Sequence, residues 1–199
     1  MSPRNDEQNE QLKDERREQI LSAALKVFGR RGFAATKISD IVTSAGMSHG
    51  LVYHYFKSKE EIFYELLKRA MTASSQALLE VEGMPLSPIE KVRQTAKFIL
   101  GGIEGFKDSA YYFLIVAHAS VMETPGAQYE ELINTSDIPV HAMARILAAG
   151  QQADEIKDGD VYGMALTFFA AIQGLAIYKL AIKDFNMPDP EILVNMVRK

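Results

Sequence analysis

The sequence of 199 residues contains no cysteine. Neither a disulfide framework nor a thiolate metal site is therefore available, and catalysis by a sulfur nucleophile is excluded. The N-terminus is polar and charged and lacks the apolar region of a secretion signal. We also find no uncharged apolar run of the roughly 18 residues that a membrane span requires. These absences predict a cytoplasmic protein with no membrane partner.

Motifs for catalysis and for metal binding are missing as well. The four histidines do not have metal-ligand spacing, and the chain contains no G-x-S-x-G nucleophile motif. The stretch "GGIEG", residues 101–105, has the glycines of a phosphate loop, but it follows helical sequence instead of a strand. The stretch "DEIKDGD" lacks an oxygen ligand at the third position of a calcium loop. We therefore expect no enzymatic activity, no metal and no cofactor.

The chain does have an apolar content of 47%, which is enough for a sizeable core. Its net charge of −4 is unevenly distributed. Between residues 16 and 59, eight lysines and arginines outnumber the two acidic residues, Glu18 and Asp40. Such a local excess of positive charge suits a polyanionic partner, although a solvated helix surface gives the same pattern.

The N-terminal part of the chain has the spacing of several helices. Over residues 15–31, apolar residues recur every three or four positions, and Gly32 ends the pattern. Thr36 can cap a short helix, and Gly46, which tolerates the left-handed conformation, can end it. Ser48 can then cap a second short helix. Two short helices joined by "SAGMS" predict a helix-turn-helix within a compact bundle.

A longer helix follows the second short one. It begins at an S-x-x-E capping box over residues 58–61. Beyond it the pattern stays helical to the end of the chain, with no strand-like alternation. We predict an all-α protein with a charged, disordered tail over 1–12, a helix-turn-helix domain over 13–70 and a second helical domain over 71–199.

The segment "TKISDIVTSAGMSHGLVYHYFKSKEEIFYELL", residues 36–67, is similar to the DNA-binding motif of the TetR family of bacterial transcriptional repressors. The preceding "RREQILSAALKVFGRRGFAA" resembles the first helix of that family. The likeness is dense over residues 16–67 and weaker beyond them. It implies a three-helix DNA-binding domain at the N-terminus and a helical domain at the C-terminus that binds an effector and dimerises. The implied function is a ligand-responsive repressor that acts on duplex operator DNA.

The second short helix is the expected recognition helix. Such a helix presents its N-terminal residues to base edges in the major groove, while flanking groups hold phosphates. This places Ser48, His49, Gly50 and His54 near bases or backbone. Tyr53 lies one turn beyond His49 and can offer its hydroxyl to a phosphate.

Residues at the starts of the neighbouring helices are expected to bind phosphates as well. Thr36 and Lys37 lie at the N-terminus of the preceding helix, where free N–H groups attract an anion. Lys59 has the equivalent place on the following helix, and the resemblance assigns both Tyr53 and Lys59 to phosphates. Lys57 is interpreted as a solvated side chain.

The C-terminal half is expected to provide a dimer interface. Residues 161–181 are apolar on nearly every face, and a monomer of this size can hardly surround such a helix. A second copy can cover it. A last helix that begins near Asp189 is expected to join the same interface, so that two helices from each copy meet.

Polar side chains within these apolar helices predict a cavity for an apolar or aromatic effector. A role in the core or the interface is the alternative for each residue taken singly. The candidates are Tyr111, His118, Met122, Tyr162, Phe168 and Gln173.

We therefore predict a homodimeric regulator whose partners are operator DNA and a small molecule. The alternative from another class is an all-helical ligand-binding or scaffolding protein without DNA function. Binding of duplex DNA by the basic face of residues 16–59 separates the two.

Overall fold

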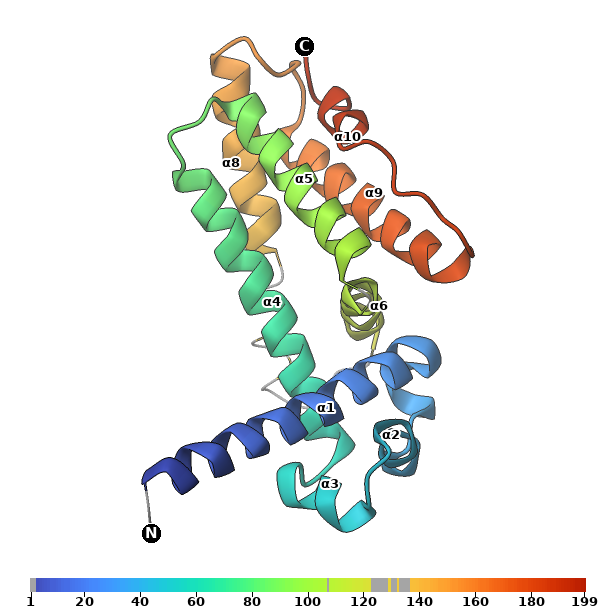
Figure 1. Ribbon diagram of the computed structural model, residues 1–199. Helices are drawn as coiled ribbons and strands as arrows, with labels where there is room; N and C mark the ends of the chain where they lie inside the picture. Colours follow the sequence, from blue (N-terminus) through green and yellow to red (C-terminus); the bar gives the residue numbers. More distant parts are fainter. Residues whose placement is uncertain (1–2, 107, 123–128, 130–131, 133–136) are drawn as a thin grey trace. The chain divides into compact units, whose positions relative to one another are not determined.

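The computed structural model describes residues 3–106, 108–122, 129, 132 and 137–199 (Figure 1). Within these ranges it contains helices and no strand. The helices are α1 (Pro3–Ala35), α2 (Ile38–Ala45), α3 (His49–Tyr55), α4 (Lys59–Gly83), α5 (Pro88–Gly105), α6 (Ser109–Ser120), α8 (Ile138–Gln152), α9 (Val161–Ala181) and α10 (Glu191–Asn195). The prediction of an all-α protein is confirmed.

The chain divides into two compact units, Met1–Leu67 and Lys68–Lys199. Helix α4 begins in the first unit and ends in the second. The domain boundary that we predicted at residue 70 lies within this same helix. A continuous helix therefore joins the two units along the chain.

The first unit is built around a small apolar core. Helix α1 packs against α2, and α2 against α3. Phe28 of α1 meets Phe63 of α4, with ring centroids 5.0 Å apart and the ring planes inclined at 66°. Ile41 from α2 and Val52 from α3 are fully buried. Each short helix is thus held by one apolar face, which leaves its other face available.

The expected disordered tail, residues 1–12, is instead helical from Pro3. Proline suits the first turn of a helix, and the residues that follow are rich in Glu, Gln and Arg, which lose little freedom in a helix. Residues 8–16 are exposed, and the buried face of α1 begins only at Ile20. Helix propensity, and not packing against the core, accounts for this extension.

Two glycines shape the region between α1 and α3. Gly32 has φ 73° and ψ 167°, which interrupts the helical path of α1. Gly46 has φ 66° and ψ 32° and closes α2, with its N–H donating to the carbonyl of Thr43 at 3.2 Å. Both values of φ lie in the left-handed region, where a Cβ atom is strained. The position of the second short helix therefore depends on a glycine that the sequence identified.

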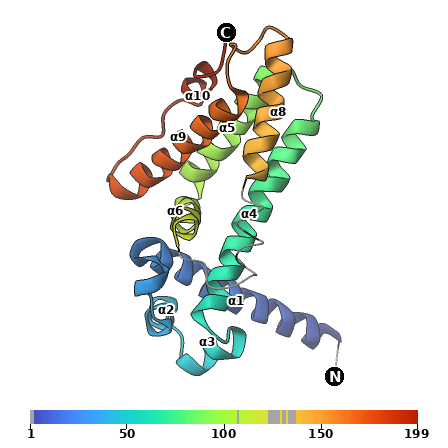
Figure 2. The ribbon, with the colours of Figure 1, turned by 180° about the vertical axis from the view of Figure 1, so that it is seen from behind.

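The second unit has a core formed by several long helices. Helix α9 packs against α8 and α6, and α8 packs against α5 (Figures 1 and 2). Leu100, Leu147, Phe168 and Ile172 are among the side chains that are fully or almost fully buried there. This core places α6 and α9, which carry most of the predicted effector residues, in direct contact.

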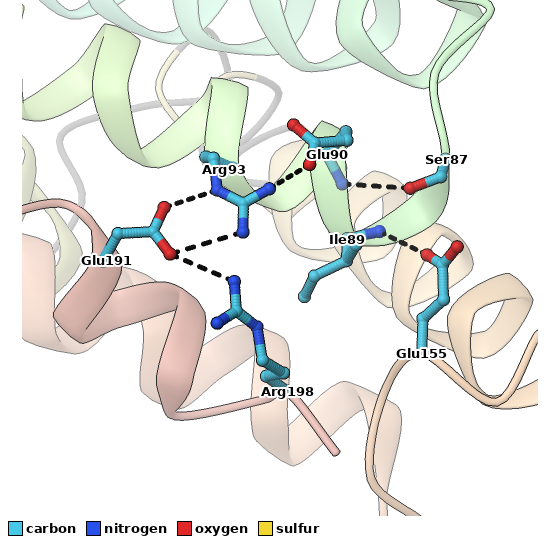
Figure 3. A network of polar contacts seen from close by, with 7 residues as sticks. All are labelled: Ser87, Ile89, Glu90, Arg93, Glu155, Glu191 and Arg198. Carbon is cyan, nitrogen blue, oxygen red and sulfur yellow. Dashed lines mark hydrogen bonds and ion pairs between the residues drawn. The ribbon is translucent and has the colours of Figure 1, made fainter.

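The C-terminal segment is fastened to α5 by a network of charged side chains (Figure 3). The guanidinium of Arg93 on α5 donates to the carboxylates of Glu90 and Glu191. The Glu191 carboxylate also accepts a hydrogen bond from Arg198 Nη2 at 3.1 Å. Nearby, the N–H of Ile89 donates to the carboxylate of Glu155 at 2.9 Å. Charge-assisted hydrogen bonds, which are stronger than neutral ones, therefore hold α10 in place.

The same packing uses part of the apolar side of the last helix within the protomer. Leu193, Val194 and Val197 are buried where α10 packs against α5, whereas Ile192 is 57% exposed. Asp189 does precede the helix as expected, and its carboxylate accepts the N–H of Glu191 at 2.8 Å. The expectation that this helix joins a dimer interface stays a prediction.

The Arg93 network predicts a pH-dependent contribution to stability. Because Arg93 donates to the Glu191 carboxylate, the pKa of Glu191 is held below its ordinary value of 4.5. A carboxylate whose pKa is lowered by folding stabilises the protein above its ordinary pKa, and this contribution is lost as the pH falls through the lowered value. We expect Arg93→Met to lower the unfolding temperature at neutral pH, and the difference from the wild type to shrink as the pH falls below 4.5 and through the lowered pKa of Glu191.

Circular dichroism during heating measures both quantities. Arg16→Met is the matched control, because the partner of Arg16 is the neutral side chain of Gln19. Its effect should not vary with pH. A stability difference for Arg93→Met that stays constant across the acid range would contradict the assignment to Glu191.

Candidate functional site

Helix α3 exposes its N-terminal face to solvent. Ser48 is its N-cap, with Oγ accepting the N–H of Leu51 at 3.2 Å. Val52 is fully buried and anchors the opposite face. His49, Gly50, Tyr53 and His54 are exposed, as a helix that reads bases requires. These are five of the eight residues predicted to contact DNA: Ser48, His49, Gly50, Tyr53 and His54.

Side chains from α1 support the helix-turn-helix from behind. Gln19 Nε2 donates to the carbonyl of Ala45, at the end of α2, at 3.0 Å. The Arg17 guanidinium lies 5.0 Å from the ring centroid of Phe56 and pairs with Glu65 at 3.3 Å. Phe56 is almost fully buried. One arginine of the basic N-terminal part is therefore structural.

Asp40 fixes the start of α2. Its carboxylate accepts the N–H of Lys37 at 2.9 Å and pairs with Arg31 at 2.9 Å. The hydrogen bond from the Lys37 backbone and the charge of Arg31 hold the pKa of Asp40 below its ordinary value. Asp40 therefore remains ionised at neutral pH and keeps the Lys37 backbone in the capping position.

A hollow of about 320 Å³ opens within the first unit, and we call it the α2–α4 hollow. The side chains of Lys37 and Lys57 are exposed, and neither ammonium group has a hydrogen-bond acceptor within the part of the chain that the structure describes. Tyr53 adds a phenol. This lining suits an anionic group such as phosphate. The residues around the hollow are Thr36, Lys37, Ile38, Tyr53, Lys57, Ser58, Lys59 and Glu60.

Thr36 does not have the role that we predicted from the sequence. Its side chain is 1% exposed, and Oγ1 donates to the carbonyl of Gly32 at 2.7 Å. The cap of α2 is Lys37 instead. A threonine hydroxyl that bonds to the carbonyl four residues earlier is a common local alternative to capping. The Thr36 hydroxyl is therefore engaged within the chain.

Lys59 is also engaged within the protein. Its Nζ donates to the carbonyl of Phe33 at 3.0 Å and to that of Thr36 at 2.8 Å. The same atom lies 4.5 Å from the ring centroid of Phe33. Lys59 thus lies at the α2–α4 hollow, but most of its hydrogen-bonding capacity is directed at the end of α1.

Lys57 is exposed, as its interpretation as a solvated side chain predicted, and it also lines the hollow. The tripeptide "KSK" has a lysine on each side of Ser58, which accepts the N–H of Glu61 at 3.3 Å as the capping box predicted. Nothing in the linear pattern tells which of the two lysines bonds to the protein and which faces solvent. The position of Phe33 and Thr36 decides this, because their carbonyls bind Lys59.

The predicted effector residues are only partly gathered. Tyr111 and Phe168 are buried on α6 and α9, two helices that pack together. His118, also on α6, has a buried Nδ1 atom without a hydrogen-bond partner among the described residues. Tyr162 differs, because it is exposed at the start of α9 with its ring centroid 5.3 Å from that of His141 on α8. Met122 and Gln173 are half-buried.

Helix α9 has a buried face and an apolar exposed face. Ala165, Ile172 and Ala176 point into the core, whereas Leu166 is 52% exposed and Ile177 is 42% exposed. By length and composition the helix could cross a membrane, with a mean hydropathy of 1.5, so the expectation that no stretch reaches this length was wrong. Its contacts with α8 and α6 bury one face of the helix within the second unit, and the other face is exposed.

An exposed recognition helix, supported from behind and flanked by a basic hollow, defines a helix-turn-helix protein of the DNA-binding class. Residues 20–66 match the family model "Bacterial regulatory proteins, tetR family". The N-terminal helix-turn-helix part of the chain is thus similar to that of the TetR family of bacterial regulators. The resemblance that was read from residues 16–67 is thereby confirmed.

Similarity to individual proteins is concentrated in the same part of the chain. The transcriptional regulator HbdR of Aromatoleum sp. (strain CIB) is 38% identical over 82 residues, which is 41% of this chain and 35% of HbdR. The transcriptional repressor NicS of Pseudomonas putida is 34% identical over 89 residues, which is 45% of this chain and 42% of NicS. The chain thus matches less than half the length of either relative.

Likeness of fold extends over nearly the whole chain. The structure of AibR in complex with isovaleryl coenzyme A and operator DNA superposes with a TM-score of 0.72 over 90% of this chain and 94% of AibR. The sequence identity is 16%, so the comparison concerns the fold alone. The C-terminal helical unit therefore has the architecture of a TetR-type regulator even where the sequence has diverged.

Proposed function

We propose that the protein is a transcriptional repressor that binds operator DNA as a homodimer and leaves it when a small molecule binds. The observation that carries the proposal is the exposed N-terminal face of α3 beside the α2–α4 hollow. His49 and Gly50 would meet bases, while Lys37 and Tyr53 would hold phosphates. NicS is named a repressor and the AibR structure contains operator DNA, which supports the same role here.

The exposed face of α9 supports the dimer. Apolar side chains on one face of a packed helix are costly in water and are relieved when a second copy covers them. A two-fold axis would present two recognition helices to successive major grooves, roughly 34–36 Å apart. A regulator of this kind works in the cytoplasm, where its operator is.

An effector is proposed to bind in the second unit near α6 and α9. The unpartnered Nδ1 of His118 is the polar group best suited to orient a ligand, with Tyr111 and Phe168 as apolar walls. Met122 and Gln173 remain further candidates. AibR was crystallised with isovaleryl coenzyme A, and a ligand with an apolar acyl or aromatic part fits the same chemistry here.

The DNA-binding proposal predicts opposite effects of one mutation on stability and on binding. A Cβ atom added at Gly50 would meet nothing within 4 Å inside the protein. Alanine is favoured over glycine in a helix by about 0.5–1 kcal/mol, so Gly50→Ala should stabilise the protein. The new methyl group should nevertheless weaken operator binding, because it occupies the surface that approaches the bases.

Fluorescence anisotropy with a duplex selected from a random pool by the wild-type protein measures this binding. Gly101→Ala is the matched control, since Gly101 is exposed on α5 and also has open space around it. It should stabilise without affecting DNA. His49→Ala should relax the sequence preference. If the wild-type protein selects no duplex from the pool, the DNA-binding proposal is wrong, and the alternative of a ligand-binding or scaffolding protein applies.

The dimer proposal predicts that a charge on the exposed face of α9 prevents assembly. Ile177→Glu would bury an unpaired carboxylate in the interface, at a cost of about 3–5 kcal/mol. We expect monomers in sedimentation velocity and a large loss of operator affinity. Leu79→Glu, at an exposed leucine on α4, is the control and should remain dimeric. A wild-type protein that sediments as a monomer at micromolar concentration would rule out the interface.

The effector proposal predicts a separation of ligand binding from folding. A buried polar atom without a partner costs free energy, so His118→Phe should keep or raise the unfolding temperature. Loss of one hydrogen bond should lower the affinity for a ligand found by thermal-shift screening about tenfold. Operator affinity should not change. His141→Phe, at an exposed histidine, is the control. If calorimetry gives the same ligand affinity for the wild type and both variants, His118 is not part of the site.

A further inference from the structure

The connection between α8 and α9, residues 153–160, is folded closely against the end of α8. We call it the α8–α9 corner. The N–H groups of Glu155 and Ile156 both donate to the carbonyl of Gly150, at 2.9 and 3.2 Å. The Ile156 side chain is 1% exposed. A Cβ atom at Gly150 would come within 2.4 Å of Ile156 Cδ1, so only a residue without a side chain admits Ile156 at this place.

Residues 197–199 close the corner from its other side through an isolated antiparallel bridge. The N–H of Lys157 donates to the carbonyl of Val197 at 3.0 Å. The N–H of Lys199 donates to the carbonyl of Glu155 at 3.2 Å. We call residues 197–199 the C-terminal clamp, because they bind the backbone of the α8–α9 corner directly.

Charged side chains of the C-terminal clamp add to this contact. The Lys199 ammonium pairs with the carboxylate of Asp154 in the corner. Arg198 Nη2 donates to the carboxylate of Glu191 at 3.1 Å (Figure 3). Ion pairs at the surface contribute little to stability. The backbone hydrogen bonds and the side chain of Val197, which is 2% exposed, therefore supply most of the hold on the corner.

The α8–α9 corner in turn determines where α9 begins. Gln151 Nε2 donates to the carbonyls of Lys157 and Gly159, both at 3.0 Å. The carboxylate of Asp160, the N-cap of α9, accepts the N–H of Tyr162 at 3.1 Å. Tyr162 is 42% exposed and lies in the first turn of the helix. The helix that carries the proposed dimer face thus starts directly from the clamped corner.

A two-fold dimer uses the same face of α9 twice. An error in the direction or the rotation of α9 in one protomer is repeated in its partner, so contacts are lost on both sides of the interface. A face that is held in its bound position before association binds more tightly, because less freedom is lost on binding. Connecting loops are otherwise among the segments of a fold that open most readily.

We propose that the C-terminal clamp positions α9 for dimerisation. By holding Ile156 against Gly150, it fixes the start of α9 and presents the exposed face of that helix to a second copy of the chain. Ile156 and Val197 are buried within their own protomer, so they act through α9 and not by touching the partner. The proposal rests on the homodimer proposed above.

Gly150→Ala tests the clamp by displacing Ile156. We expect the dimer dissociation constant to rise about tenfold, because overpacking shifts the corner. In an Ile156→Ala background the same substitution should have little further effect, since the side-chain atoms that lie closest to the added methyl group are then absent. Gly101→Ala, at an exposed glycine of α5 with open space around it, is the matched control.

Val197→Ala loosens the clamp without adding atoms, and it carries the test if Gly150→Ala does not fold. Its control is Val81→Ala, which removes the same two methyl groups at a buried valine of α4. Both variants should lower the unfolding temperature, but only Val197→Ala should weaken the dimer and speed amide exchange over residues 155–163. This difference separates a positioning role from a general loss of stability.

Sedimentation equilibrium of the full chain gives the dissociation constants, and hydrogen exchange with mass spectrometry reports on the corner. Equal dissociation constants for the wild type and Val197→Ala overturn the proposal. An equal weakening of the dimer by Val81→Ala and Val197→Ala overturns it as well. A wild-type protein that is monomeric at micromolar concentration would instead refute the homodimer, so the two failures are distinguished.

Discussion

The contact of the Lys59 ammonium with the carbonyls of Phe33 and Thr36 is the interaction on which the geometry of the first unit depends. Helix α1 ends after a left-handed glycine, and the carbonyl of Phe33 in its last turn also accepts the N–H of Thr36 at 3.2 Å. By binding the carbonyls of Phe33 and Thr36, Lys59 joins the end of α1, the start of α2 and the start of α4. Lys37, Tyr53 and Lys57 can then line one hollow, although they come from different segments.

The recognition helix is stable because one of its faces is buried, while the other is exposed. Val52 and Phe56 are buried, and Arg17 covers the ring of Phe56 while pairing with Glu65. A helix as short as α3 is marginal alone and takes its stability from such packing. The exposed face can therefore carry residues chosen for binding. Part of the positive charge of this unit, including Arg17, therefore stabilises the fold and is engaged within the protein.

The second unit resolves an ambiguity in the sequence of α9. Its 21 residues are apolar enough to suggest a membrane span, a buried core helix or an interface. The structure divides the helix into a face with Phe168 and Ile172, which lies in the core, and a face with Leu166 and Ile177, which is exposed. The last helix is fastened to α5 through Arg93 and Glu191.

The sequence by itself determined the all-α class, the helix-turn-helix, the glycine that closes α2 and the cap of α3, because periodicity, capping and backbone preference are local. It also identified His49, Gly50, Tyr53 and His54 as an exposed set. Only the tertiary structure decided that Thr36 turns inward, that Lys59 is bound by carbonyls and that Lys57 faces the hollow. These outcomes depend on where the end of α1 lies in space, and a linear pattern does not contain the position of acceptors that lie more than twenty residues away.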